Sequence, residues 1–147
     1  MTSKRLQVLD AVKALVVSAL PSADVKGLNA DDAKPESIGP GGTVIVRAGD
    51  PGEPEVDLSP TRYNYDHAIP LEVGAYESAS KTSEQVLDEM LAAIGLKISE
   101  DPTLGGLVDW LEPSAASTDD FDAVGAVAGR WADLEIRASY ATTAPLN

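Results

Sequence analysis

The sequence lacks cysteine and contains a single histidine, His67. Without cysteine the chain can form neither a disulfide framework nor a thiolate site, which fits a cytosolic or redox-indifferent setting. With one histidine, a metal site or a nucleophile–histidine pair would have to be completed by carboxylates and hydroxyls, and none stands at a recognisable spacing. We therefore predict a structural role for His67, and we expect no catalytic residue, no metal site and no cofactor.

Basic residues are scarce, since 11 Lys and Arg stand against 24 Asp and Glu and leave a net charge of −13. A protein that grips nucleic acid needs clustered cations to neutralise phosphates, so this balance argues against that class. The acids are scattered along the chain, and solubility is the simplest account of them.

Long apolar runs are also missing. No stretch approaches the roughly 20 apolar residues of a membrane-spanning helix. Asp10 and Lys13 interrupt the apolar run near the N-terminus, and no convincing small-x-small cleavage site follows it, so we expect no secretory signal. The expectation is a soluble protein with no membrane partner, and 147 residues are the usual length of one domain.

The strongest positive pattern is a helix that begins after Thr82 and ends before Pro102. Thr82 and Gln85 have the spacing of a capping box, in which each side chain bonds the other residue's backbone N–H. Apolar residues then recur at three- and four-residue steps and form one stripe. These are Val86, Leu87, Met90, Leu91, Ile94 and Ile98.

A second amphipathic helix is predicted over Ser3–Leu20, with Pro21 ending it. Its main apolar stripe consists of Leu6, Leu9, Val12, Val16 and Leu20. Residues 22–42 are polar and rich in Asp, Gly and Pro, and they read as a connecting loop.

Strands are predicted at Thr43–Ala48, where β-branched residues cluster, and at Tyr63–Ala75 and Ala132–Tyr140, where apolar residues alternate. Leu107–Leu111 is a shorter candidate. Pro70 has no N–H to give to a ladder, so it predicts an edge or a bulge.

The segment Gly49–Pro54 carries two glycines and two prolines and is predicted to be a hairpin tip or a mobile loop. The order of elements is then helix, strands, helix, strands. This order predicts an α+β fold, a mostly antiparallel sheet with two helices packed on one face.

One acidic cluster is a candidate cation site. Asp119 and Asp120 with Asp122 lack the glycine and the distal glutamate of a calcium loop, so a solvated acidic turn is the better interpretation.

Five segments carry a wider pattern. They are the helix ending at Leu20-Pro21, the string Val46-Arg47-Ala48-Gly49-Asp50-Pro51, the strand Tyr63–Val73, the string Asp101-Pro102-Thr103-Leu104-Gly105-Gly106-Leu107-Val108, and the strand Ala132–Tyr140. In this order they resemble the tail terminator family (tail-completion, minor tail protein U-like) of long-tailed phages and gene transfer agents.

The resemblance implies a small α+β subunit of a homohexameric ring that caps the tail tube, ends its elongation and joins the tail to the head connector. The implied partners are further copies of the chain, a tail-tube protein and a head-completion or connector protein. The implied location is the virion tail, assembled in the host cytoplasm. The family brings no catalytic residues.

Two sets of residues gain a role on this interpretation. The segment between Arg47 and Arg62 is expected to be mobile in the free subunit and to order against a neighbour, and the Leu107–Leu111 and Ala132–Tyr140 strands are expected to leave sheet edges. The expected interface residues are Arg47, Asp50, Arg62, Asp119 and Asp120. Acids on or beside the long strand, with Arg62 as the only base there, are expected to line a channel that DNA passes without binding. These acids are Asp57, Asp66, Glu72 and Glu77.

Other interpretations stay open. The segment between the two arginines could be an ordinary exposed loop, and the acids could serve solubility alone. Another head–tail connector or a tail-tube protein would share the same plan. A small-molecule enzyme or ligand-binding domain would be favoured by a pocket with converging polar groups.

Overall fold

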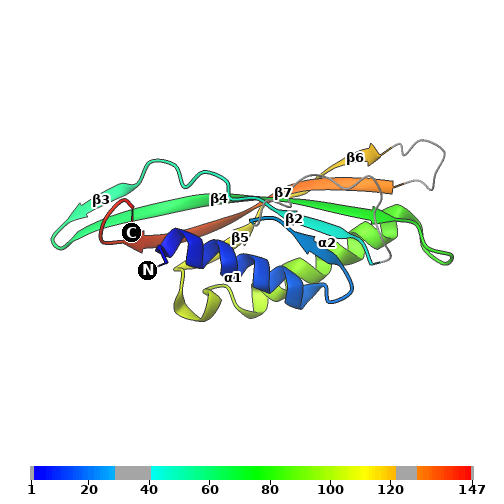
Figure 1. Cartoon of the computed structure of the whole chain (residues 1–147), viewed down its shortest axis with the longest axis horizontal. Helices are drawn as coiled ribbons and strands as arrows, with labels where there is room; N and C mark the ends of the chain where they lie inside the picture. Colours follow the sequence, from blue (N-terminus) through cyan, green and yellow to red (C-terminus); the bar gives the residue numbers. More distant parts are fainter. Residues whose placement is uncertain (1, 29–40, 122–128, 147) are drawn as a thin grey trace.

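The computed structural model describes residues 2–28, 41–121 and 129–146. Within them the chain forms two α-helices, one 3-10 turn and a seven-stranded sheet (Figure 1), which confirms the predicted α+β class. The helices and the turn are α1 (Lys4–Ala19), α2 (Ser83–Glu100) and η1 (Leu104–Gly106). The strands are β1 (Asp24–Lys26), β2 (Thr43–Val46), β3 (Glu55–Leu58), β4 (Thr61–Tyr76), β5 (Trp110–Pro113), β6 (Ser117–Phe121) and β7 (Gly129–Thr142).

Two long antiparallel strands, β4 and β7, form the centre of the sheet, and we call them the spine. β4 has 16 residues and β7 has 14. They pair without a break from Tyr63 opposite Thr142 to Tyr76 opposite Gly129. Both strands were predicted from their period-two patterns, and the structure extends each by a few residues.

Each strand of the spine carries two short strands in line along its outer edge. β2 and β3 both pair with β4, and β5 and β6 both pair with β7, while β1 joins β2 in parallel. The prediction that the Ala132–Tyr140 strand leaves a sheet edge is therefore wrong, because β5 and β6 cover it. β6 lies in a polar stretch that showed no alternation, so the sequence carried no strand signal there.

The flank formed by β2 and β3 is interrupted opposite Pro70. The backbone N–H of Arg47 donates to the Pro70 carbonyl at 2.9 Å, so the backbone polar groups of Pro70 face this flank, where proline has no N–H to offer. Gly49 packs into the interruption with φ +65°, and a Cβ there would lie 2.1 Å from the carbonyl oxygen of Ala68. Pro70 therefore marks a break in its neighbour, although β4 is an inner strand.

The segment Gly49–Pro54 is not a hairpin tip. It links β2 to β3 along the edge of β4, and Asp50 forms an isolated bridge with Ala68. The tip lies instead at Ser59 and Pro60, between β3 and β4. The predicted strand that begins at Thr43 accordingly ends two residues early, before this link.

The predicted Leu107–Leu111 strand is wrong in its first half. Gly105 and Gly106 adopt positive φ values of 68° and 94°, and the Thr103 side chain accepts the Gly106 N–H. These contacts hold η1 as a turn, and the chain enters β5 only at Trp110. A short apolar run without alternation, here Leu107 and Val108, does not by itself distinguish such a turn from a strand.

Both helices lie on the same side of the spine in Figure 1. Their buried side chains join a single core with alternate residues of β4 and β7. The buried helical residues are Val8, Leu9, Val12 and Val16 from α1 and Leu87, Met90, Ile94 and Ile98 from α2, among others. The prediction that Leu6 belongs to the buried stripe is wrong. Leu6 is 40% exposed, because six residues before Val12 corresponds to a position about 120° round the helix.

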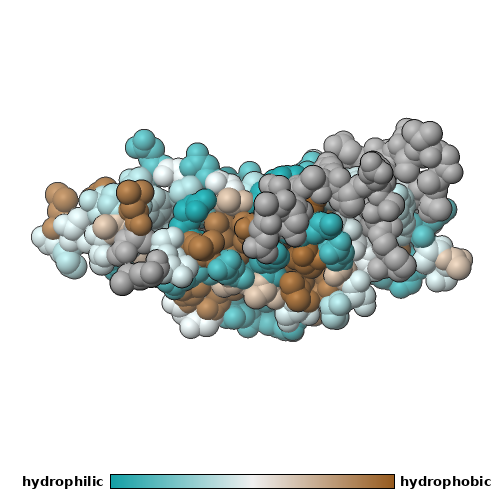
Figure 2. All heavy atoms as spheres, viewed as in Figure 1, coloured by the Kyte–Doolittle hydropathy of each residue, from teal (hydrophilic) through white to brown (hydrophobic). Residues whose placement is uncertain are grey.

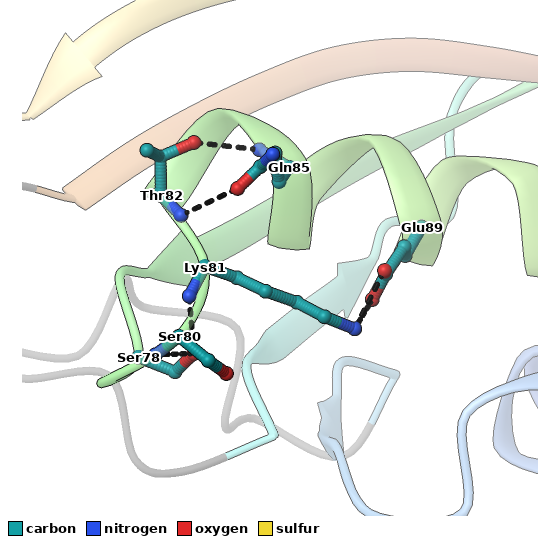
Figure 3. Close-up of polar contacts among 6 residues, drawn as sticks. All are labelled: Ser78, Ser80, Lys81, Thr82, Gln85 and Glu89. Atoms are coloured by element: carbon teal, nitrogen blue, oxygen red, sulfur yellow. Dashed lines mark hydrogen bonds and ion pairs between the residues drawn. The ribbon is translucent and has the colours of Figure 1, made fainter.

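The predicted capping box is confirmed at the start of α2 (Figure 3). The Gln85 backbone N–H donates to Thr82 Oγ1 at 3.2 Å, and the Thr82 N–H donates to Gln85 Oε1 at 3.0 Å. Lys81 reaches past them to Glu89, with Nζ at 2.7 and 2.9 Å from the two carboxylate oxygens. These contacts fix where the chain turns back from the end of β4 to cover the spine.

Candidate assembly surfaces

The hairpin Glu55–Asn64, formed by β3 and the start of β4, extends beyond the helices (Figure 1). The 16 residues of β4 span about 50 Å at roughly 3.3 Å per residue, whereas the 18 residues of α2 span about 27 Å at 1.5 Å per residue. α2 alone is therefore about half as long as the spine, and α1, which is displaced from it towards the hairpin, ends short of the hairpin as well (Figure 1). All of β3 is exposed as a result.

The two sides of this hairpin differ in chemistry. Val56 and Leu58 lie on the side of the sheet on which Tyr65 is buried, yet they are 47% and 80% exposed. On the other side, Asn64 Nδ2 donates to Asp57 Oδ2 at 3.0 Å. The hairpin is thus an amphipathic ribbon, and the helices that would bury its apolar side end before it.

The start of α1 and the C-terminal turn lie at the same end of the molecule. Lys4 and Arg62 line one hollow of about 400 Å³. The Tyr65 hydroxyl donates to the Pro145 carbonyl at 3.2 Å, and Leu146 next to it is 96% exposed. Figure 2 shows brown, apolar residues at this end, beyond the helices. Cations and exposed apolar side chains therefore lie together at this end, beside the acids Glu55 and Asp57 of the hairpin.

The face of the spine turned away from the helices, called the open face below, carries three of the four predicted channel acids. Asp66 and Glu72 lie on it in β4, and Asp57 lies on it in β3. Glu77 comes after the end of β4 and is exposed. The structure thus brings three of these acids to one face and leaves the fourth outside the strand.

Two further arginines lie beside these acids. Arg47 Nε is 2.5 Å from Glu72 Oε2, and Arg137 Nη1 is 3.3 Å from Asp66 Oδ2. The expectation that Arg62 is the only base there is wrong, because strand pairing brings two more from β7 and from the end of β2. The alternation of β7 places Arg137 on the polar side of that strand, and this was the sequence signal that could have indicated a base beside these acids.

A shallow hollow of about 390 Å³ lies on the open face beside the ion pair of Arg47 and Glu72. Asp133 and Glu135 of β7 also line it, and Asp133 is the direct register partner of Glu72. Like charges directly opposite destabilise a sheet, so the guanidinium of Arg47 offsets this repulsion. In the described ranges no group of three or more potential metal ligands comes together.

The structure does not bring the predicted interface residues together. Arg47 lies at the interruption of the flank, Asp50 lies in the link, and Arg62 lies in the projecting hairpin. Asp119 and Asp120 belong to β6, which pairs with the opposite end of the spine, and their side chains are outside the described residues. The segment between the two arginines contains β3 and is therefore not one continuous loop.

His67 is fully buried beside Tyr140. Its Nε2 lies 2.7 Å from the Ala48 carbonyl, which can only accept, so Nε2 carries the proton and Nδ1 accepts from the Tyr140 hydroxyl at 2.9 Å. Burial lowers the pKa of His67 below its ordinary value of 6.5, against a smaller opposite effect of the Ala48 bond. Burial also raises the pKa of Tyr140 to about 12. Both ring nitrogens are occupied, which fits the predicted structural role.

No family model matches the sequence, and no curated protein is significantly similar to it. Within the described part of the chain no helix is long and apolar enough to cross a membrane. What the chain does must therefore be inferred from its surfaces.

Proposed function

We propose that the chain is a structural subunit of a homohexameric ring that caps a tail tube, stops its elongation and joins the tail to the head connector. The observation that carries the proposal is the projecting hairpin, whose apolar side has no helix to cover it. Exposed apolar surface on a strand that extends beyond the hydrophobic core indicates a site of association. The hairpin supports the need for a neighbour, and the resemblance to tail terminators supplies the hexamer, the partners and the place in the virion tail, assembled in the host cytoplasm.

The outer strands of the sheet support assembly as well. In the described residues β1 and β3 end one edge, and β5 and β6 end the other, without a further strand beside them. Such edges are templates for pairing, and a closed ring is one way in which a symmetric assembly uses them. Glu55 and Asp57 on β3 work against unlimited pairing of these edges.

The open face suits the wall of a channel that DNA passes without binding. Its acids outnumber its arginines, and two of these arginines, Arg47 and Arg137, are paired with carboxylates, which weakens their attraction for phosphates. A lysine at the exposed Asp133 should slow DNA ejection while leaving the fold and the ring intact. Normal ejection from such particles would leave solubility as the role of these acids.

Two other functions compete with this one. A different head–tail connector or a tail-tube protein would use the same hairpin and is distinguished by the partner that it binds. A small-molecule enzyme would be supported by a deep pocket with converging polar groups. The hollows of about 320–400 Å³ on the described surface are shallow and open, which favours assembly.

The proposal is tested by native mass spectrometry and negative-stain microscopy of the purified chain, alone and with its tail-tube subunit. A net charge of −13 per copy opposes association at low salt, so we expect hexamers at high salt or on the tube end. A chain that stays monomeric at high salt and in the presence of tube would overturn the proposal.

A further inference from the structure

Three cations at the projecting end have no partner for their side chains among the described residues. Lys4, Arg5 and Arg62 form neither an ion pair nor a side-chain hydrogen bond there, although the chain contains 24 acids. Every other basic side chain of the described residues pairs with a carboxylate or donates to a carbonyl. These side chains are Lys13, Lys26, Arg47, Lys81, Lys97, Arg130 and Arg137.

Two of these cations occupy positions that a helix disfavours. α1 begins at Lys4, so Lys4 and Arg5 lie in its first turn, and that turn contains no acid. The N-terminus of a helix carries a partial positive charge, so cations there are unfavourable. α2 has the favourable arrangement, because Glu84 lies in its first turn and pairs with Arg130 at 2.7 Å. Departures from such local rules are expected where a surface has a function.

The hollow of about 400 Å³ at this end is lined by cations from two elements. Lys4 comes from the start of α1 and Arg62 from the start of β4, and Thr142 at the end of β7 lies between polar neighbours on its wall. No acid is among the described residues that line it. Asp57 is the register partner of Arg62, but its carboxylate accepts from Asn64 and forms no ion pair with Arg62. The hollow is therefore a basic site in a chain of net charge −13.

The charge of the whole chain restricts what can occupy this hollow. Duplex DNA and a second copy of the chain are both strongly anionic, and a net charge of −13 opposes the approach of either at low salt. A short segment with one or two carboxylates meets mainly the local field, because charges beyond about 10 Å are screened at roughly 0.1 M salt. Leu58 and Leu146 at the same end are 80% and 96% exposed, so apolar residues beside those carboxylates would cover them.

We infer that this hollow binds a glutamate or aspartate side chain of a partner protein, within a short segment in which apolar residues flank the acid. Lys4 and Arg62 supply the charges that bind the carboxylate, and Arg5 in the same helical turn adds to the positive potential. A bound carboxylate also offsets the unfavourable position of the two cations at the start of α1. The inference goes beyond the proposed ring and does not depend on it, because one copy supplies the whole hollow.

Nuclear magnetic resonance of the full, isotope-labelled chain at low salt tests the site, under conditions in which the net charge opposes self-association. The probe is a short synthetic peptide, blocked at both ends, in which two glutamates are flanked by leucines. We expect it to shift the amide resonances of Lys4, Arg62 and Thr142 and of their neighbours in the chain. The same peptide with lysines in place of the glutamates is the matched control and should shift none of them.

Inorganic phosphate and a short DNA duplex are titrated in parallel to identify the ligand class. Shifts with the glutamate peptide alone support the inference. Equally strong shifts with phosphate or DNA would mean that the hollow recognises phosphate groups, and equal shifts with the lysine peptide would mean that only the apolar surface binds. Either result, or the absence of shifts with every probe, overturns the inference. All of these outcomes are measured on the monomer, so they leave the test of the ring unaffected.

Lys4→Glu separates binding from stability. It should weaken binding of the glutamate peptide by about threefold to tenfold, because it replaces an attraction by a repulsion. It should also raise the Tm, because it places an acid at the positive end of α1, so a loss of binding would not result from unfolding. Lys81→Glu is the matched control, because it changes the net charge equally at an exposed cation that does not line the hollow. Equal losses in the two variants would indicate a general charge effect and contradict the proposed site.

Discussion

The covered middle of the spine and its projecting hairpin have the same alternating pattern, but their apolar side chains differ in burial. Ile69 and Leu71 in the middle of β4 are fully buried, whereas Leu58 in the hairpin is 80% exposed. All three lie on the same side of the sheet. Alternation therefore specifies which side of a strand is apolar, and the length of the helical layer decides how much of that side is buried in one copy.

The largest expected contrast comes from truncating one leucine in each region. Leu71→Ala should lower the free energy of unfolding by about 2–5 kcal/mol, because it removes a fully buried side chain and leaves a cavity. Leu58→Ala should change it by no more than about 0.5 kcal/mol in the monomer, because Leu58 is largely exposed. Urea unfolding of dilute monomer measures both. Comparable losses would show that the hairpin is covered within one copy.

A fall in pH that protonates His67 in the unfolded chain should lower the free energy of unfolding of the covered region. Because burial lowers its pKa, the folded chain keeps His67 neutral at a pH at which the unfolded chain already takes up a proton. This contribution to stability is complete above a pH of about 6.5 and is lost as the pH falls towards the lowered value, by up to about 1.4 kcal/mol per pH unit.

The measurement is the free energy of unfolding between pH 5 and 7 for the natural chain and for His67→Gln. Carboxylates titrate in both chains, so the difference between the two curves isolates His67. We expect a shallower pH dependence in the variant. Parallel curves would mean that His67 titrates alike in the folded and the unfolded chain.

Gly49 tests the interruption that separates the two regions along the edge of β4. Gly49→Ala should destabilise the fold by about 1–3 kcal/mol, because its φ is +65° and a Cβ would meet the Ala68 carbonyl oxygen at 2.1 Å. Gly52→Ala is the matched control, with a φ of +71° and nothing within 4 Å of its Cβ. Unfolding of both variants separates backbone strain, present in each, from the close approach to β4. Equal losses would show that the packing of the link on β4 is unimportant.

Much of the covered region could be predicted from the sequence, because its signals are local. The capping box at Thr82, the stripe from Leu87 to Ile98 and the alternation of the two long strands each need only neighbouring residues to be read. Burial of the stripe follows directly from helical spacing. Leu6 is exposed although it continues the three- and four-residue spacing, because it lies too far round the helix from the centre of the stripe.

The surfaces could not be predicted to the same extent, because strand pairing creates them. Arg137 meets Asp66 only when β7 pairs with β4, at a separation of 71 residues. β6 has no pattern of its own and exists because the edge of β7 offers it hydrogen bonds. Whether Val56 and Leu58 are covered depends on where both helices end relative to the spine, and alternation in β3 carries no information about that.

The smallest expected effect lies at the point where the covering layer begins. Thr82→Ala should cost about 1 kcal/mol, because it removes the acceptor for the Gln85 N–H at the start of α2. Lys81→Ala is the control, since its ion pair with Glu89 is exposed and exposed pairs contribute about 0.2–1 kcal/mol. The two variants should differ in where they affect the structure as well as in the size of the stability loss. Loss of the cap should also speed hydrogen exchange in the first turn of α2 and leave the projecting hairpin unaffected, because the hairpin has no helix over it. Equal acceleration in the hairpin and the first turn would mean that the two regions open together, and that the projecting end depends on the helical layer after all.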